Sequence, residues 1–402
     1  MEIKYKKILA ILFLLVMGVV WINSGSFTSL QKIEDFLRRG VGIHYFSREV
    51  GSEDSTLTMD MIETEYASQM WKRQDLINFN GAVAKLLRMQ GYYGSKGIYI
   101  TEDRYIVSPS PWTSTDYEYD QMLSLYHFLL KKDIHLMYIN EPNKYVDDSL
   151  FEKNFGIESY SNRNADSFLQ RIKKAGIHVI DLRDELKQDK LNIYDMFYRT
   201  DHHWTTRSGL WASEKIAKGL NKYCGYAIDT SIYDEENYSF TNWKACWLGE
   251  QGRVVAASYV GLDDYTAIKP KFATNYTFKN GDILQQGTFE DFINEDVYNA
   301  DEDVYVNPSW HYSYSQPNVI NNNVEYGKVL ILGDSYEQVV VPFLSLGVSE
   351  VDSIILRSFS GNIRDYIEQG EYDTVLICYA QFMIGAHDDT ESANYKMFTF
   401  EQ

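Results

Sequence analysis

The chain has 402 residues, which is enough for one large α/β domain or two small ones. Hydrophobic residues make up 45% of it and aromatic residues 15%, so the composition predicts a folded protein with a core. The formal net charge is -19 and no stretch rich in Lys or Arg follows residue 7, which argues against nucleic-acid binding. The 32 tyrosines are compatible with a surface that faces carbohydrate and also with core packing.

The N-terminus resembles a targeting signal. Lys4, Lys6 and Lys7 precede an uncharged apolar stretch over residues 8–22, whose length suits a signal h-region and is slightly short for a full span. Positive charge before this stretch and none until Lys32 predicts that the N-terminus lies inside and the body outside. We expect residues 1–23 to be a retained signal anchor, with a cleaved signal peptide as the alternative. The protein is then a single-pass protein of the cell membrane with an extracytoplasmic body.

Residues 24–74 have mixed polarity and no sustained period, and they are interpreted as a stalk and entry segment. Helices and strands then alternate, which predicts an α/β domain with parallel strands joined by crossover helices. The predicted elements are a helix over 75–90, two short strands over 97–105, a helix over 115–131, a strand over 134–139, a helix over 164–175 and a strand over 177–182.

This alternation of helices and strands stops after Gly225. Residues 226–327 are rich in Tyr, Asn, Asp and Thr and lack long helical periods, so they predict an irregular, β-rich insertion that shapes a substrate cleft. The α/β pattern resumes with three apolar strands over 328–332, 352–356 and 374–379. The expected architecture is therefore one domain over residues 75–402, with a mostly parallel sheet and an insertion at 226–327.

Three cysteines are too few for a disulfide scaffold or a zinc site. Cys378 lies in an apolar run and is predicted to be a core residue. Cys224 and Cys246 are predicted either to pair, if the protein is exported, or to remain two unrelated buried thiols.

The first chemical motif is Gly333-Asp334-Ser335-Tyr336, directly after the apolar strand at 329–332. A parallel strand brings its C-terminal end to the ligand-binding edge of an α/β sheet, and backbone N–H groups at such a turn can stabilise an oxyanion. The triplet Gly-Asp-Ser is also common in ordinary turns, and the alternative interpretation is that residues 333–335 form such a turn.

The second motif is Asp201-His202-His203-Trp204, which precedes a predicted helix capped by Thr205 or Thr206. A serine nucleophile needs a base that is oriented by a third group. In an extended segment residues i and i+2 point the same way, so Asp201 can reach one ring nitrogen of His203 and leave the other for Ser335. His202 is then expected to face the opposite side. The alternative is a pair of histidines on a polar loop.

Together, the two motifs resemble the DHHW family and the related SGNH-hydrolase-like domain of alginate O-acetyltransferases, over roughly residues 75–380. The resemblance includes four further segments, at 141–144, 180–183, 249–253 and 263–265. It implies a three-layer SGNH-hydrolase-like fold, with Ser335 as nucleophile, His203 as base and Asp201 as the residue that orients the base.

One departure concerns the oxyanion donors, because the chain has no clear counterpart of the Gly and Asn donors of the wider SGNH class. Candidates for oxyanion or substrate contacts are Gly361, Asn362, Gln381, Tyr336 and Trp204. Neither a metal nor another cofactor is expected.

The resemblance favours transfer of an acetyl group to an exported or cell-surface polysaccharide through an acyl-serine. A multi-spanning membrane O-acyltransferase is then the expected acyl-donor partner. The alternatives are a secreted SGNH-type carbohydrate esterase and a non-catalytic carbohydrate-binding scaffold. A metal-dependent phosphoesterase is a further rival, because Asp-His-His also begins a metal-ligand motif; that chemistry needs several more ligands, and the chain has 8 histidines.

Overall fold

The computed structural model describes residues 72–91, 97–298, 310–315, 317–385, 390 and 393–400. The predicted signal anchor, residues 1–23, lies outside the described residues, as does nearly all of the predicted stalk. No helix within the described ranges is long and apolar enough to cross a membrane. The chain divides into two units, residues 1–83 and 84–402. In the first unit the described part begins helix α5 (Arg73–Leu86), where the sequence predicts a helix.

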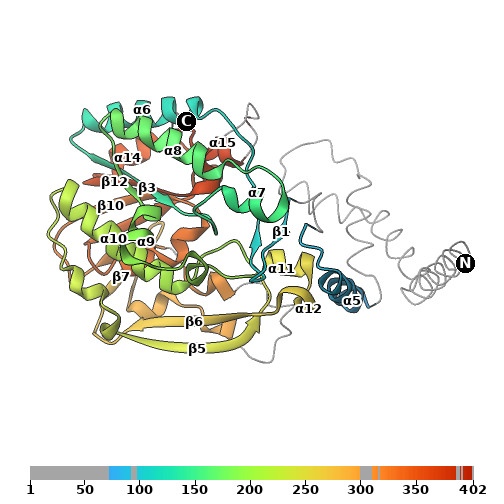
Figure 1. Cartoon of the computed structure of the whole chain (residues 1–402). Helices are drawn as coiled ribbons and strands as arrows, with labels where there is room; N and C mark the ends of the chain where they lie inside the picture. The colour runs from blue at the N-terminus through green and yellow to red at the C-terminus, as the bar shows by residue number, and fades with distance from the viewer. Residues whose placement is uncertain are drawn as a thin grey trace, which may run out of the picture. The chain divides into compact units, whose positions relative to one another are not determined.

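A mixed sheet of eight strands runs through the second unit (Figure 1). Five parallel strands form one part of it, in the order β4 (His178–Asp181), β3 (His135–Glu141), β12 (Thr374–Ala380), β10 (Lys328–Gly333) and β11 (Glu350–Ile354). Three antiparallel strands extend it beyond β11: β9 (Asn318–Asn321), β7 (Tyr276–Asn280) and β8 (Ile283–Gly287). The sheet is more mixed than the sequence predicts, because strands from residues 226–327 join its edge instead of staying apart.

Helices cover both faces of this sheet and make a three-layer fold (Figure 1). Successive side chains of a strand point to opposite faces, so a buried strand feeds two cores. In β10, Leu330 and Leu332 pack with α6 (Asp116–Leu130), α8 (Ser161–Lys174) and α14 (Ile363–Gly370). Val329 and Ile331 pack instead with α9 (Leu182–Asp189), α10 (Thr206–Tyr223) and α13 (Val341–Leu344). This alternation confirms the α/β prediction.

Helix α10 is the platform for the histidine motif. Thr205 caps it by accepting a hydrogen bond from the Ser208 N–H, as the sequence predicts. Gly209 lies so close to the turn after β10 that a Cβ atom there would be 2.1 Å from the Val339 carbonyl oxygen. Only glycine therefore allows α10 to pack directly on the segment that follows Ser335.

Smaller elements border the sheet. Two antiparallel ribbons are β1 (Tyr99–Ile100) with β2 (Ile106–Val107), and β5 (Tyr238–Trp247) with β6 (Asp263–Pro270). The remaining α-helices of the described residues are α7 (Ser149–Phe155), α11 (Glu250–Val255), α12 (Ala257–Val260) and α15 (Ala393–Met397). The 3-10 turns in the same ranges are η2 (Ile193–Met196), η3 (Thr230–Tyr233), η4 (Glu235–Asn237), η5 (Phe289–Phe292), η6 (Glu295–Tyr298), η7 (Trp310–Ser313), η8 (Ser335–Val339), η9 (Leu356–Ser358) and η10 (Gln381–Met383).

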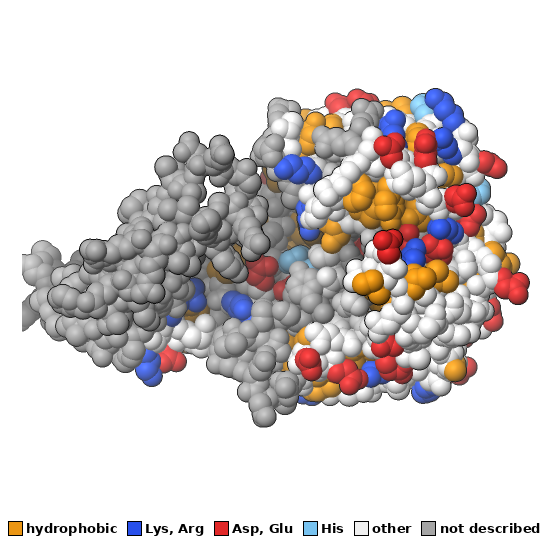
Figure 2. Space-filling view, turned by 180° about the vertical axis from the view of Figure 1, so that it is seen from behind, with side chains coloured by type: hydrophobic (Ala, Val, Ile, Leu, Met, Phe, Trp, Pro, Cys, Tyr) orange, Lys and Arg blue, Asp and Glu red, His pale blue; other side chains and the backbone are white. Residues whose placement is uncertain are grey.

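All three cysteines are free thiols, so the structure does not pair Cys224 with Cys246. Cys378 is fully buried in β12, as the sequence predicts. On the face that Figure 2 shows, acidic and basic side chains are interspersed over the coloured residues.

Candidate active site

Asp201, His203 and Ser335 lie in one hydrogen-bonded chain. The Nδ1 atom of His203 is 2.6 Å from Asp201 Oδ1, and its Nε2 atom is 2.8 Å from Ser335 Oγ. An ionised carboxylate only accepts hydrogen bonds, so Nδ1 carries the proton and Nε2 is free to accept from the serine hydroxyl. Asp201 and His203 are buried, whereas Ser335 is partly exposed. This arrangement is suited to activating a serine.

The histidine loop, which we define as residues 198–204, differs from the extended segment that the sequence predicts. It is a bent loop closed at its base by pairing between Phe197 and Trp204. Asp201 Oδ1 accepts from the backbone N–H of His203 at 3.0 Å, so the carboxylate closes an Asx turn as well as holding the ring. The prediction that His202 faces the opposite side is wrong. Because the loop bends, the His202 ring packs on the His203 ring with centroids 3.9 Å apart.

The start of α11 and of β6 holds this loop from outside. The Glu250 N–H donates to Asp201 Oδ2 at 2.8 Å, and the Gly249 N–H donates to the Thr200 hydroxyl oxygen at 2.8 Å. Asp263 accepts from the backbone N–H of Thr200 at 2.8 Å. A Cβ atom on Gly249 would lie 2.4 Å from the Cβ atom of Asp201, so this close approach requires glycine. These positioning roles could not be assigned from the sequence, although both segments belong to the resemblance.

The nucleophile turn, which we define as residues 333–337, follows β10. Ser335 is the first residue of η8, and Asp334 caps this turn by accepting from the Tyr336 N–H at 2.9 Å. The second oxygen of Asp334 accepts from the Ala380 N–H at 2.8 Å, which ties the turn to the end of β12. Burial raises the pKa of the Asp334 carboxyl. The predicted position of Ser335 at a strand end is confirmed, with a 3-10 turn in place of a full helix.

Trp204 and Tyr336 join the histidine loop to the nucleophile turn. The Trp204 indole donates to the backbone carbonyl of Tyr336 at 3.0 Å, and the Tyr336 hydroxyl donates to the backbone carbonyl of His202 at 2.6 Å. Both side chains are buried. These reciprocal bonds fix the distance between His203 and Ser335 across the two loops. The Trp204 N–H thus binds the backbone of the nucleophile turn, which gives this residue a structural role.

A cavity of about 450 Å³ lies beside these two loops. Its wall combines aromatic rings with polar and charged groups, a combination that suits a small polar ligand. The lining residues are Ile106, Val107, Ser108, Pro109, Ser110, Asn143, Lys144, Tyr145, His202, Glu250, Gln251, Tyr336 and Phe382.

Comparison with known proteins connects this site to a family. Residues 127–267 match the family model described as SGNH hydrolase-like domain, acetyltransferase AlgX. This match confirms the predicted resemblance. The matched residues contain the histidine loop and end before the nucleophile turn, which the fold brings to it. No curated protein matches the chain.

Two solved structures share the fold. One is Bacillus cereus PatB1 with a sulfonyl adduct, which is 20% identical, covers 76% of this chain and 97% of its own, and has a TM-score of 0.58. The other is a DHHW family protein from Eubacterium siraeum, which is 13% identical, covers 73% of this chain and 93% of its own, and has a TM-score of 0.54.

The remaining predicted candidates lie in different settings. Asn362 is the N-cap of α14, where its side-chain oxygen accepts from the backbone N–H groups of the first turn, and it is exposed together with Gly361. Gln381 is buried, and its amide donates to Ser161 Oγ at 2.8 Å. The structure thus gives Asn362 a capping role and Gln381 a place in a buried polar network. Tyr336 does line the cavity.

Two basic groups on the cavity wall, His202 and Lys144, have lowered pKa values. Burial, with the neighbouring His203, lowers the pKa of His202 to about 4, so this ring is neutral at about pH 7. Burial lowers the pKa of Lys144 to about 8. The Lys144 ammonium donates to the Arg199 carbonyl at 3.3 Å and to Gln251 Oε1 at 3.4 Å.

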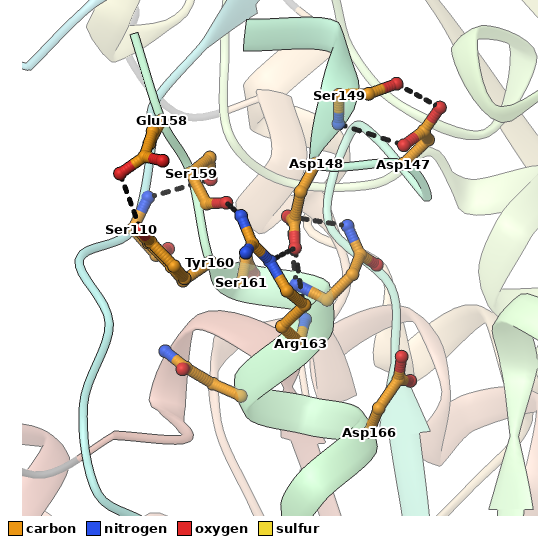
Figure 3. A network of polar contacts seen from close by, with 12 residues as sticks. Ser110, Asp147, Asp148, Ser149, Glu158, Ser159, Tyr160, Ser161, Arg163 and Asp166 are labelled. Atoms are coloured by element: carbon orange, nitrogen blue, oxygen red, sulfur yellow. Dashed lines mark hydrogen bonds and ion pairs between the residues drawn. The ribbon is translucent and has the colours of Figure 1, made fainter. Parts of the chain in front are cut away.

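The loop that carries Lys144 is held by the polar network in Figure 3. The carboxylate of Asp148 accepts from the backbone N–H groups of Asn162 at 3.1 Å and Arg163 at 3.0 Å. It therefore caps α8 from another part of the chain and complements the positive end of the helix dipole. The Ser110 N–H donates to the Ser159 hydroxyl at 3.2 Å, which ties another cavity-lining segment to the residues just before α8 (Figure 3).

The metal hypothesis concerns Asp201, His202 and His203, whose ligand atoms lie within 4.8 Å of one another. A hydrolytic metal centre needs more ligands that converge from strand ends. Both ring nitrogens of His203 are already hydrogen-bonded, to Asp201 and to Ser335. The geometry therefore favours serine activation over metal ligation.

Proposed function

We propose that this protein is a serine-dependent O-acetyltransferase that acetylates an exported or cell-surface polysaccharide. The observation that carries the proposal is the chain from Asp201 through His203 to Ser335, at 2.6 and 2.8 Å, beside a cavity of about 450 Å³. The family match supports acyl transfer as the reaction class.

In this mechanism Ser335 attacks the carbonyl carbon of an acetyl donor while its proton passes to His203 Nε2. The tetrahedral intermediate collapses, the donor's leaving group takes that proton, and an acetyl-serine remains. A sugar hydroxyl then gives its proton to the same nitrogen and attacks the ester carbonyl. The serine oxygen leaves with the proton, which restores the enzyme. Asp201 holds the Nδ1–H throughout and stabilises the imidazolium that forms twice.

The resting orientation of His203 favours this role over a structural one. A buried histidine that serves only packing needs partners for its nitrogens, and a backbone group would suffice. Here the partner of Nε2 is the partly exposed Ser335 hydroxyl in the turn after β10, and the partner of Nδ1 is the buried Asp201 carboxylate. The imidazole therefore lies between a carboxylate and a serine hydroxyl, as serine activation requires.

Labelling with a sulfonyl fluoride or a fluorophosphonate tests the nucleophile. We expect intact-protein mass spectrometry to show one adduct on the wild-type protein and none on Ser335→Ala, whose thermal unfolding should match the wild type. The related PatB1 structure contains a sulfonyl adduct, which makes this probe a suitable one. Equal labelling of a folded Ser335→Ala protein would exclude Ser335 as the nucleophile.

Transfer is separated from hydrolysis by the fate of the acetyl group. With p-nitrophenyl acetate as donor and cell-surface polysaccharide from the producing cells as acceptor, we expect acetyl esters to accumulate on the polysaccharide. Release of free acetate alone, at the same rate with and without polysaccharide, would identify a carbohydrate esterase instead.

We further propose that the body lies outside the membrane and receives its acyl group from a multi-spanning membrane O-acyltransferase. The support is the lysine cluster before the apolar residues 8–22 and the fact that cytoplasmic acyl donors cannot reach an exported site. External protease should degrade the body in intact, wall-stripped cells. Protection until the cells are lysed would contradict this topology.

A further inference from the structure

Two acidic side chains, one in the nucleophile turn and one at the end of β3, are fully buried. Glu337 belongs to η8, two residues after Ser335, and Glu141 is the last residue of β3. Both are 0% exposed. Within the described residues, their four carboxyl oxygens have no hydrogen-bond partner other than the opposite carboxyl, with which each side chain is in contact. Buried carboxyl groups are normally paired with donors or cations, so this pair needs a physical explanation.

The sheet register brings the two carboxyls together. Glu141 is paired with Ala380 of β12, and Cys378 of β12 is paired with Gly333 of β10, so the C-terminal ends of β3 and β10 lie on either side of β12 at the same edge of the sheet. Glu337 packs tightly over that edge, because a Cβ atom on Gly333 would lie 2.2 Å from Glu337 Cγ. The two carboxyls are close enough for each to shift the pKa of the other.

The surroundings favour protons over charge. Burial, and then the negative charge of Glu337, raises the pKa of Glu141 well above its usual value. Burial raises the pKa of Glu337 to about 8. Asp334 is the nearby charge that raises both values further, and the other titratable groups facing the pair are Tyr138, Tyr336 and Cys378. Two like charges this close cannot both persist in such an apolar site.

We propose that Glu141 and Glu337 share a proton, and that this carboxyl–carboxylate contact positions the nucleophile turn against the end of β3. The O–H of one group donates to an oxygen of the other, which gives the pair the donor that no other described group supplies. Glu337 also donates its backbone N–H to the Asp334 carbonyl at 3.3 Å, so a force on its side chain passes directly to the turn. Both are positioning residues, because they act through Ser335.

Loss of the shared proton leaves two negative charges facing each other. Their repulsion pushes η8 away from β3 and displaces Ser335 Oγ from His203 Nε2. The rate of serine modification should therefore fall at alkaline pH, by about tenfold for each pH unit above the ionisation of the pair. A purely structural role predicts a lower rate at every pH and an unchanged profile.

The test compares Glu337→Gln and Glu141→Gln with the wild type, using the rate of fluorophosphonate labelling from about pH 6 to about pH 10. Glutamine keeps the shape and a hydrogen-bond donor but cannot ionise, so both variants should keep their rate at the alkaline end where the wild type loses it. Glu337→Leu fills the space without a hydrogen bond and should label slowly throughout. Glu118→Gln is the matched control, since Glu118 is equally buried but lies in α6 and accepts from the Gly385 N–H.

If both glutamine variants still label more slowly at alkaline pH, the proposal is wrong, and the ionisation of another group, such as Lys144, causes the decrease. Equal rates for Glu337→Leu and Glu337→Gln would overturn it too. The proposal uses the proposed function only for this readout, and failure of the wild type to label at Ser335 would refute that function alone.

Thermal unfolding then provides an independent test. A carboxyl whose pKa rises from 4.5 to about 8 on folding makes the native state lose stability as pH rises between those values. The melting temperature of Glu337→Gln relative to wild type should therefore increase across that interval. A difference that stays constant with pH would also overturn the shared proton.

Discussion

The histidine loop and the nucleophile turn reach the same site by different means. Polar contacts from segments outside the main sheet hold the histidine loop: the amides of Gly249 and Glu250 bind it, as does the carboxylate of Asp263. The nucleophile turn is held from within the sheet, because Asp334 accepts from the Ala380 N–H of β12 and Glu337 packs against Gly333 at the end of β10. The contrast teaches that the position of the base depends on buried hydrogen bonds from two accessory segments, whereas the position of the nucleophile depends on the register of the central strands.

The largest effect should come from breaking the histidine loop at its functional atom. We expect His203→Ala to lower acylation by on the order of 10³-fold or more, since it removes the base. His202→Ala should lower it much less, because the neutral ring of His202 lies on the cavity wall without a bond to Ser335. Rates of p-nitrophenyl acetate turnover measure both. Equal losses, or recovery of either variant with added zinc, would instead favour a metal site.

A smaller effect should follow when the histidine loop is displaced by a substitution outside it. In Gly249→Ala the new methyl group meets Asp201, and overpacking of this kind costs about 2 kcal/mol of unfolding free energy. Because the carboxylate moves, acylation should also fall by roughly 10²-fold.

The control for this change is Gly361→Ala. Its new Cβ atom meets only the Phe359 ring, at 3.2 Å, and the residue is exposed. Chemical denaturation and acylation rates should both stay near wild type. A large rate loss at Gly361 with normal stability would restore it as an oxyanion donor and weaken the contrast between the two regions.

The smallest effect should come from the cavity wall. Asp148→Ala removes the cap of α8 and should lower the unfolding free energy by about 1 kcal/mol. The Lys144 loop is then less well held, so KM for p-nitrophenyl acetate should rise while kcat changes little. Asp147→Ala is the matched control, because Asp147 is exposed and its side-chain contacts are with Ser149 and, at 3.8 Å, with the exposed Lys153. If Asp147→Ala and Asp148→Ala behave alike, the cap does not hold the cavity wall.

The elements that position the site were largely predictable. Strands at 134–139, 328–332 and 374–379 were identified from apolar runs, and the structure has β3, β10 and β12 there. Burial on both faces makes such runs continuous, which is a signal that adjacent residues carry. The domain boundaries at 75 and at 226–327, the anchor and the acyl-donor partner remain predictions.

The secondary candidates were predicted less well, for a consistent physical reason. Gln381 directly follows strand β12, and Asn362 lies in the loop between β11 and α14, so the local sequence of both resembles that of substrate contacts. Asn362 instead caps its own helix, and Gln381 bonds to Ser161, which is 220 residues away in the chain. A donor's partner is a property of three-dimensional packing, which a local pattern does not record.

By itself, the sequence determined the local parts of this site: a serine after a buried strand, and a carboxylate two residues before a histidine. These depend on neighbours in the chain, where steric and hydrogen-bonding rules act directly. Only the tertiary structure decided that His203 meets Ser335, 132 residues apart, and that Glu141 meets Glu337 beneath the nucleophile turn. Such contacts depend on strand order and register, which many dispersed residues set together.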